Sequence, residues 1–157
     1  MPNMIIPSVI RSLHNIFTSI WIGGMLVMVI TFLPTIRKEI KDVRLQGSLL
    51  DKLMIRHSKW VYIGIVILAV SGILMTRLSG QTSGLFNFTN PYATILSIKH
   101  ILFIAVTVIA LIRSIAFKNA ASGKDKSKKK LSMALLLINT LLGTVILVLS
   151  SITAVIG

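Results

Sequence analysis

With 157 residues, 54% of them hydrophobic, and a mean hydropathy of +0.87, the chain is too apolar for an ordinary soluble domain, in which about 45–50% of residues are apolar even with glycine counted. The absence of cysteine excludes disulfides, thiolate metal sites and covalently attached c-type haem. The formal net charge of +13 does not indicate a nucleic-acid partner, because the charges lie between apolar segments, where membrane topology accounts for them.

Four apolar segments follow one another, each long enough to cross a bilayer, which takes about 20 mostly apolar residues. The predicted spans are about 7–36, 56–77, 92–117 and 131–156. Pro7 suits the first turn of a helix, and Pro34 is expected at the far end of the first span. The N-terminus has no basic n-region and its apolar run is long, so we expect the first segment to remain a span and not to be a signal peptide.

The connecting segments differ in composition. Residues 37–55 carry apolar residues at approximately helical spacing among charges, which predicts a helical extension or a short interfacial helix. Residues 78–90 are polar and rich in Gly, Ser, Thr and Asn, which predicts a loop. Residues 120–130 are expected to form a flexible basic loop. One domain suits this length, so we predict a single all-α integral membrane domain, residues 1–157, folded as an antiparallel bundle of four transmembrane helices.

Lysine and arginine predict the orientation of the bundle. Residues 37–59 and residues 113–130 carry seven each, whereas the other side has only Arg11, Arg77 and Lys99. The positive-inside rule therefore places both basic connections in the cytoplasm and both termini outside the cytoplasmic (plasma) membrane. Membrane lipid is an expected partner, and the run Lys128–Lys130 either contacts anionic lipid or serves only as a topology signal.

A histidine lies inside the first predicted span. At about 100° per residue, His14 shares a helix face with Thr18, Trp21, Met25 and Met28. An ionisable group within a membrane helix is costly, so by default it points inward and has a function.

His100 can meet His14 at a similar depth. His14 is roughly 10 Å along a helix from Pro7, and His100 is roughly 13 Å from Pro91, at 1.5 Å per residue. Because the first and third spans run in the same direction, the two imidazoles are expected to be level within the bundle. Such a pair fits the two axial ligands of a b-type haem.

Three cations are expected on the same, outer side as this histidine pair, where they would neutralise the haem propionates. With Trp21 on the face of His14, the candidate cofactor-binding residues are His14, His100, Arg11, Arg77, Lys99 and Trp21.

Other interpretations remain open. Met25 and Met28 lie on the His14 face, and thioether and imidazole groups suit Cu(I), although methionine is also an ordinary core residue. Lys99 either pairs with a propionate or extends its ammonium group outward. His57 lies beside Trp60 in a sequence typical of the membrane interface, and its role stays undetermined.

Short motifs in the first three spans resemble a known family. From His14 the sequence reads His-x6-Trp-x-Gly-Gly, which resembles the first helix of the copper-resistance protein D (CopD) family. Arg56 and Ser58, followed by Ala69–Leu74, resemble its second helix, and Lys99 matches its third-helix lysine. The resemblance implies copper handling, as a permease or a metal-delivery subunit.

A more distant similarity is to HemJ-type protoporphyrinogen oxidases. They share the first-helix histidine, a tryptophan–glycine element and the third-helix lysine, and that group is associated with b-type haem. After Gly24 the chain departs from their pattern and lacks its Leu-Pro-Arg continuation. The similarity therefore supports haem binding but not protoporphyrinogen oxidation.

We therefore predict a CopD-like membrane protein that binds b-type haem through His14 and His100 near the outer face for one-electron transfer, with quinone or other membrane subunits as partners. The alternatives are copper transport or homeostasis, and a non-catalytic subunit of a larger membrane complex. A redox carrier or complex subunit fits better than a stand-alone enzyme, because the sequence carries no carboxylate within a span. The acidic residues all lie in connections: Glu39, Asp42, Asp51 and Asp125.

Overall fold

The computed structural model describes residues 2–79, 86–121 and 126–156, and nearly all of these are helical, with no strand among them. The first rod is one continuous run of helical turns: α1 (Pro2–Thr18), η1 (Ser19–Gly23), α2 (Gly24–Val27), η2 (Met28–Phe32) and α3 (Leu33–Glu39). Three long helices follow it: α4 (Val43–Ser79), α5 (Pro91–Ala121) and α6 (Lys126–Ile156).

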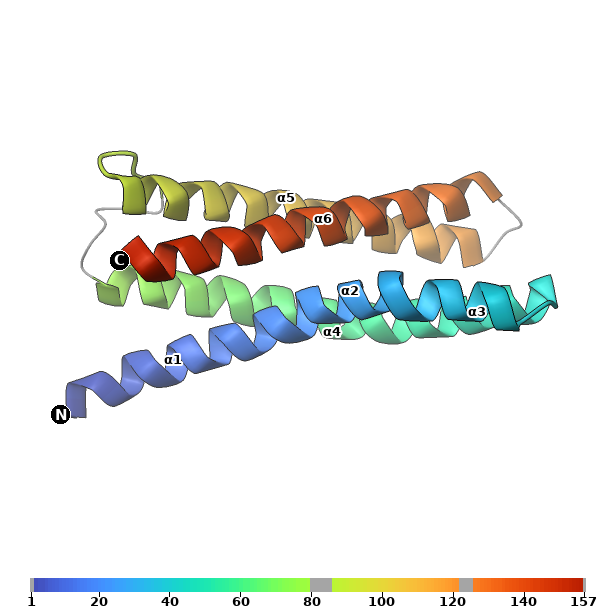
Figure 1. Cartoon of the computed structure of the whole chain (residues 1–157), viewed down its shortest axis with the longest axis horizontal. Coiled ribbons are helices and arrows are strands. Elements are labelled where there is room, and N and C mark those ends of the chain that lie inside the picture. Colours follow the sequence, from blue (N-terminus) through green and yellow to red (C-terminus); the bar gives the residue numbers. More distant parts are fainter. Residues whose placement is uncertain (1, 80–85, 122–125, 157) are drawn as a thin grey trace.

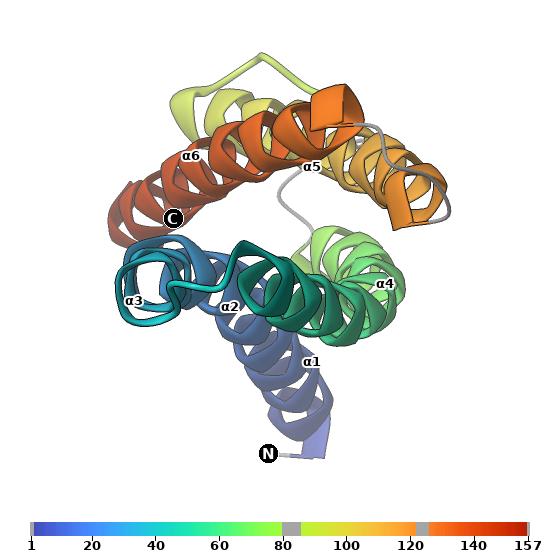
Figure 2. The same ribbon diagram turned by 90° about the vertical axis from the view of Figure 1, so that its right-hand side faces the viewer.

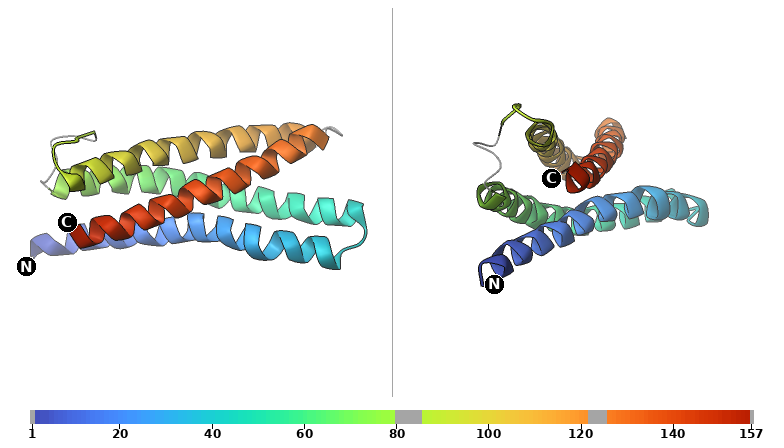
Figure 3. Two further views of the ribbon diagram at one scale, coloured as in Figure 1. Left: turned by 45° about the horizontal axis from the view of Figure 1, so that its top comes forward. Right: turned by 60° about the vertical axis from the view of Figure 1, so that its left-hand side comes forward.

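The long helices lie as two antiparallel hairpins. The first rod packs along α4, and α5 packs along α6 (Figure 1). Seen from the end, the α5–α6 hairpin lies across the other hairpin (Figure 2). Both chain termini lie at the same end of the molecule, and α3 meets α4 at the opposite end (Figure 3). We call these the termini end and the α3–α4 end.

Four helical segments are long and apolar enough to cross a membrane: Ile5–Glu39, Val43–Leu78, Pro91–Ile115 and Lys130–Ile156. Their outward surfaces carry large hydrophobic side chains, such as Val66, Ile104 and Leu141, which are 63%, 52% and 67% exposed. Contiguous apolar surface of this kind requires a lipid environment, not water. The prediction of an all-helical, multi-pass membrane protein is confirmed.

Helix boundaries differ from the predicted ones mainly by extension. The segment after residue 37 breaks only at Ile40–Asp42, and the rest joins the second span as the long helix α4, so the predicted helical extension is correct. A side-chain oxygen of Asp42 accepts from the backbone N–H of Arg44 at 2.8 Å, which caps α4. The predicted basic loop is shorter than expected, because α5 continues to Ala121 and α6 begins at Lys126; residues 122–125 lie outside the described part.

Pro7 and Pro34 both lie inside the helical rod, which itself begins at Pro2. α1 begins at Pro2, so Pro7 is an interior residue and not part of the first turn. Pro34 does not end the rod, which continues to Glu39. Proline cannot donate a backbone hydrogen bond to the preceding turn, and the π-helical segment η2 directly precedes Leu33 and Pro34. The wider π turn allows the helix to continue although Pro34 has no backbone N–H to donate.

The core lies between the two hairpins. Trp21, Met25 and Met28 of the first rod are at most 4% exposed, so the predicted inward face is confirmed for these three residues. They pack with side chains from the other three long helices into one cluster, which includes Val61, Leu68, Val106, Ala110 and Leu136. The π-helical segment η1 contributes Trp21 and Ile22 to this cluster.

Candidate functional site

His14 is held by a serine of the neighbouring helix. Its Nδ1 lies 2.8 Å from Oγ of Ser71, which is 3% exposed on α4. The Ser71 hydroxyl donates to the carbonyl oxygen of Ile67 at 2.6 Å. Because a hydroxyl has a single hydrogen, Ser71 then accepts from His14, and we assign the proton of the imidazole to Nδ1. This tautomer leaves the lone pair of Nε2 available to a metal ion.

Such an arrangement is typical of metal-binding histidines, whose second ring nitrogen donates to a fixed acceptor that sets the tautomer and the orientation of the ring. Ser71 was not among the predicted site residues. Ser71 does lie within the Ala69–Leu74 motif, which is part of the CopD resemblance. That motif is the sequence feature that could have identified Ser71 as a site residue.

Lys99 and His100 of α5 both act electrostatically on His14. The Nζ of Lys99 donates to Oγ1 of Thr153 on α6 at 3.3 Å, and the Thr153 hydroxyl donates in turn to the carbonyl oxygen of Ser150. The His100 ring lies edge-on to Phe86, with 6.4 Å between ring centroids. Lys99 and His100 thus lie on α5, which begins at the termini end, as α1 does.

The other three predicted residues have different surroundings. Arg11 and Arg77 are exposed. Trp21 is buried in the core, with its ring edge-on to Phe103 at a centroid distance of 5.9 Å. Its Nε1 has no hydrogen-bond partner among the described residues.

A second polar cluster lies toward the α3–α4 end. The His57 ring packs against Gly24, where an added Cβ would lie 2.8 Å from its Cε1. Arg113 acts electrostatically on His57, is 4% exposed and donates from Nη1 to Sδ of Met54 at 3.9 Å. The charge pattern placed Arg113 in a basic connection, but α5 continues past Arg113, and its side chain is buried. This cluster shows that His57 faces the first rod.

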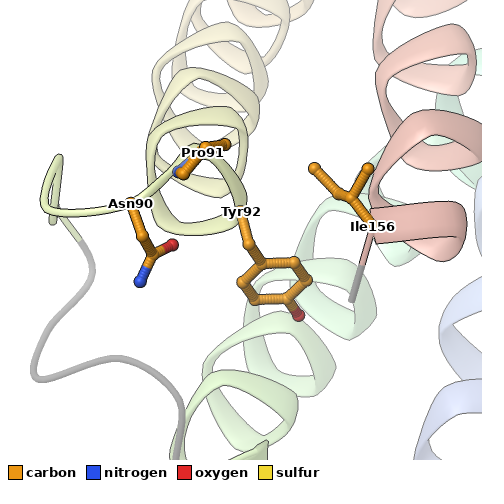
Figure 4. A pocket seen from close by; sticks show the side chains of 4 residues that line it. All are labelled: Asn90, Pro91, Tyr92 and Ile156. Atoms are coloured by element: carbon orange, nitrogen blue, oxygen red, sulfur yellow. The ribbon is translucent and has the colours of Figure 1, made fainter.

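Two surface hollows are described in the structure, and neither is lined by a histidine. One has a volume of about 520 Å³ at the termini end, where Tyr92 lies between the start of α5 and Ile156 of α6; Asn90 and Pro91 complete its lining (Figure 4). The other lies along α4 near the α3–α4 end. Among the described residues, no group of three or more His, Asp or Glu side chains is placed to hold a metal ion.

The four apolar spans define a multi-pass membrane protein. Within its first span, His14, which is bonded to Ser71, is a candidate metal ligand. The family model for copper resistance protein D (CopD) matches residues 51–155. The chain therefore belongs to the CopD family. The match contains Ser71 and Lys99 and begins after the first rod. No curated protein matches the chain, and no solved structure matches it. The similarity to HemJ-type proteins stays a prediction.

The bond between Ser71 and His14 leads to a test. Replacing Ser71 with alanine removes the acceptor that orients the imidazole, and loss of such a partner costs about 10–100-fold in metal affinity. We expect Ser71→Ala to weaken any Cu(I) binding through His14 by at least about tenfold in a chelator competition. The matched control is Ser114→Ala, which removes a buried serine that accepts a hydrogen bond from Tyr62. Equal affinities of the two variants would contradict the assigned role of Ser71.

Proposed function

We propose that this protein handles copper in the membrane, with the Nε2 of His14 as a ligand. Membership of the CopD family supports copper as the substrate. The observation that carries the proposal is the Nδ1–Ser71 bond, which leaves Nε2 as the free coordinating nitrogen. Imidazole is a suitable ligand for copper, and the half-buried ring lies where an ionisable membrane residue is expected to act.

His100 is the proposed second ligand, because it lies on another helix, α5, which begins at the same end of the molecule as α1. Farther along the first rod, Met25 and Met28 are buried, and thioether sulfur favours Cu(I). The proposed substrate is therefore Cu(I), which enters at the termini end. The lysine and arginine distribution supports a cytoplasmic-membrane location with the termini end outside.

Lys99 opposes a bound cation. Its ammonium group acts on His14, and like charges repel strongly where the dielectric constant is low. Such repulsion weakens binding and suits a site that must release its ion. We expect Lys99→Leu to raise Cu(I) affinity on the order of tenfold, while the exposed Lys130→Leu leaves it unchanged. Weaker binding in Lys99→Leu would contradict this role.

The decisive experiment is metal analysis of the purified protein after loading with Cu(I) under reducing conditions, together with copper uptake into proteoliposomes. We expect the wild-type protein to bind copper and the His14→Ala variant to lose it. We also expect proteoliposomes to take up more copper than empty vesicles. Binding without uptake would restrict the function to copper delivery or storage. A protein that retains no copper and co-purifies with unrelated chains would support a non-catalytic subunit of a larger complex.

Haem b with electron transfer to quinone or another subunit is the second candidate, favoured by the placement of His14 and His100 on different helices. The described residues fit a macrocycle less well. The CopD family match supports copper and not haem, and the expected propionate partners Arg11 and Arg77 are exposed. A reduced-minus-oxidised spectrum with an α-band would restore the haem interpretation over copper.

A further inference from the structure

The hollow near the α3–α4 end is built entirely from one face of α4. Its volume is about 530 Å³, and it is lined by Lys52, Ile55, Arg56, Lys59, Trp60 and Ile63. These positions follow the i, i+3, i+4, i+7 spacing of a single helix face. We call this surface the α4 groove. Three cations and three apolar side chains thus border one shallow, mostly open hollow on the surface of α4.

The α4 groove faces away from the protein core. Ile55, Trp60 and Ile63 are 48%, 50% and 45% exposed. Met54 and Val61, which are buried residues in the same stretch of α4, lie on its other face. The groove is therefore open to the surroundings of the protein.

The groove also lies where the membrane surface is expected. Residues 60–76 of α4 carry no charge and rise about 25 Å at 1.5 Å per residue, close to the hydrocarbon thickness of about 30 Å. Lys59 and Trp60 therefore sit at the boundary, where tryptophan concentrates at headgroup level. Beyond Ile63, the exposed side chains of Val66 and Val70 continue the same face into the apolar zone.

We propose that the α4 groove binds one anionic glycerophospholipid, with its phosphate between Lys52, Arg56 and Lys59 and an acyl chain along Trp60 and Ile63. Cations near the membrane surface attract anionic headgroups, whereas the apolar rim suits a chain. The site is distinct from the proposed copper site at the other end of the molecule. It depends only on the membrane location.

A second copy of the chain is a poor occupant by charge. Each copy carries a formal net charge of +13 and only four acidic residues, so docking this basic groove against another copy brings like charges together. An anionic lipid instead supplies the missing negative charge and the apolar chain in one molecule.

Native mass spectrometry of the full protein, titrated with phosphatidylglycerol or phosphatidylcholine, tests the site. We expect one tightly held phosphatidylglycerol in preference to phosphatidylcholine. Each cation contributes about fivefold in affinity, so the triple variant Lys52→Gln/Arg56→Gln/Lys59→Gln should lose at least about tenfold of that preference. The matched control, Lys38→Gln/Lys41→Gln/Arg44→Gln, removes the same charge from exposed positions outside the groove. This control should keep the preference for phosphatidylglycerol.

Fluorescence provides a measurement that does not depend on the charge variants. The chain has two tryptophans, of which Trp21 is 2% and Trp60 is 50% exposed. Phosphatidylglycerol brominated near the start of its chains should quench wild-type emission more than the matching brominated phosphatidylcholine, and Trp60→Phe should remove the difference.

Three results would overturn the proposal. One is equal loss of preference in both triple variants, which would mean diffuse attraction to the basic surface. Another is equal quenching by the two brominated lipids. The third is a dimer that forms without lipid and is lost only in the groove variant, which would assign the groove to a second copy.

Discussion

His14→Ala is expected to weaken Cu(I) binding by more than about 100-fold, because loss of a ligand costs at least as much as loss of the group that orients it. The measurement is competition with a Cu(I) chelator of known affinity under reducing conditions. The matched control is His57→Ala, which makes the same substitution in the cluster near the α3–α4 end. We expect His57→Ala to keep the wild-type affinity.

The structure predicts that His14→Ala folds. The variant loses the bond to Ser71, but the Ser71 hydroxyl keeps its acceptor, the carbonyl oxygen of Ile67. No buried donor is left without a partner by this change, so the cost in free energy of unfolding should be near that of one hydrogen bond, about 1 kcal/mol. A folded His14→Ala protein that binds copper like wild type would refute His14 as a ligand.

Gly24→Ala is expected to have the largest effect on stability. The added Cβ would lie 2.8 Å from Cε1 and 3.2 Å from Nδ1 of His57, so the imidazole must move within a packed interface. Overpacking of this kind costs about 1–3 kcal/mol in free energy of unfolding. The measurement is a denaturant titration of the protein in detergent micelles, followed by circular dichroism.

The neighbouring glycine is the matched control. A Cβ added at Gly23 meets nothing within 4 Å, and alanine is favoured over glycine inside a helix by about 0.5–1 kcal/mol, so Gly23→Ala should be neutral or stabilising. In a His57→Ala background the penalty of Gly24→Ala should disappear, because the ring is gone, as a double-mutant cycle would reveal. A penalty that persists without the ring would mean that contact with His57 is not its cause.

The membrane class and the four spans were predictable from sequence because lipid imposes a simple rule. A helix of about 20 mostly apolar residues is long enough to cross the hydrocarbon core, and it forms all of its backbone hydrogen bonds internally. The inward face of Trp21, Met25 and Met28 was also predictable, because helical periodicity is local. The ends of the helices were less predictable, since polar turns of α4, α5 and α6 extend the helices beyond the apolar segments.

The candidate site was only partly predictable. His14 and Lys99 could be selected because charged or ionisable groups inside a span are costly. Ser71 and Thr153 were not predictable as their partners, because short polar residues are common in membrane helices and their role depends on which helix they face. Arg113 was assigned to a connection because its burial depends on how far α5 continues.

By itself, then, the sequence determined that this is an all-helical, cysteine-free protein with four spans, because hydropathy and helical periodicity are properties of neighbouring residues. Only the tertiary structure decided which nitrogen of His14 bonds to Ser71 and that His57 packs on Gly24. Both features depend on contacts between helices. His14 and Ser71 are 57 residues apart in the chain, and Gly24 and His57 are 33 apart, so each pair meets only in the folded state.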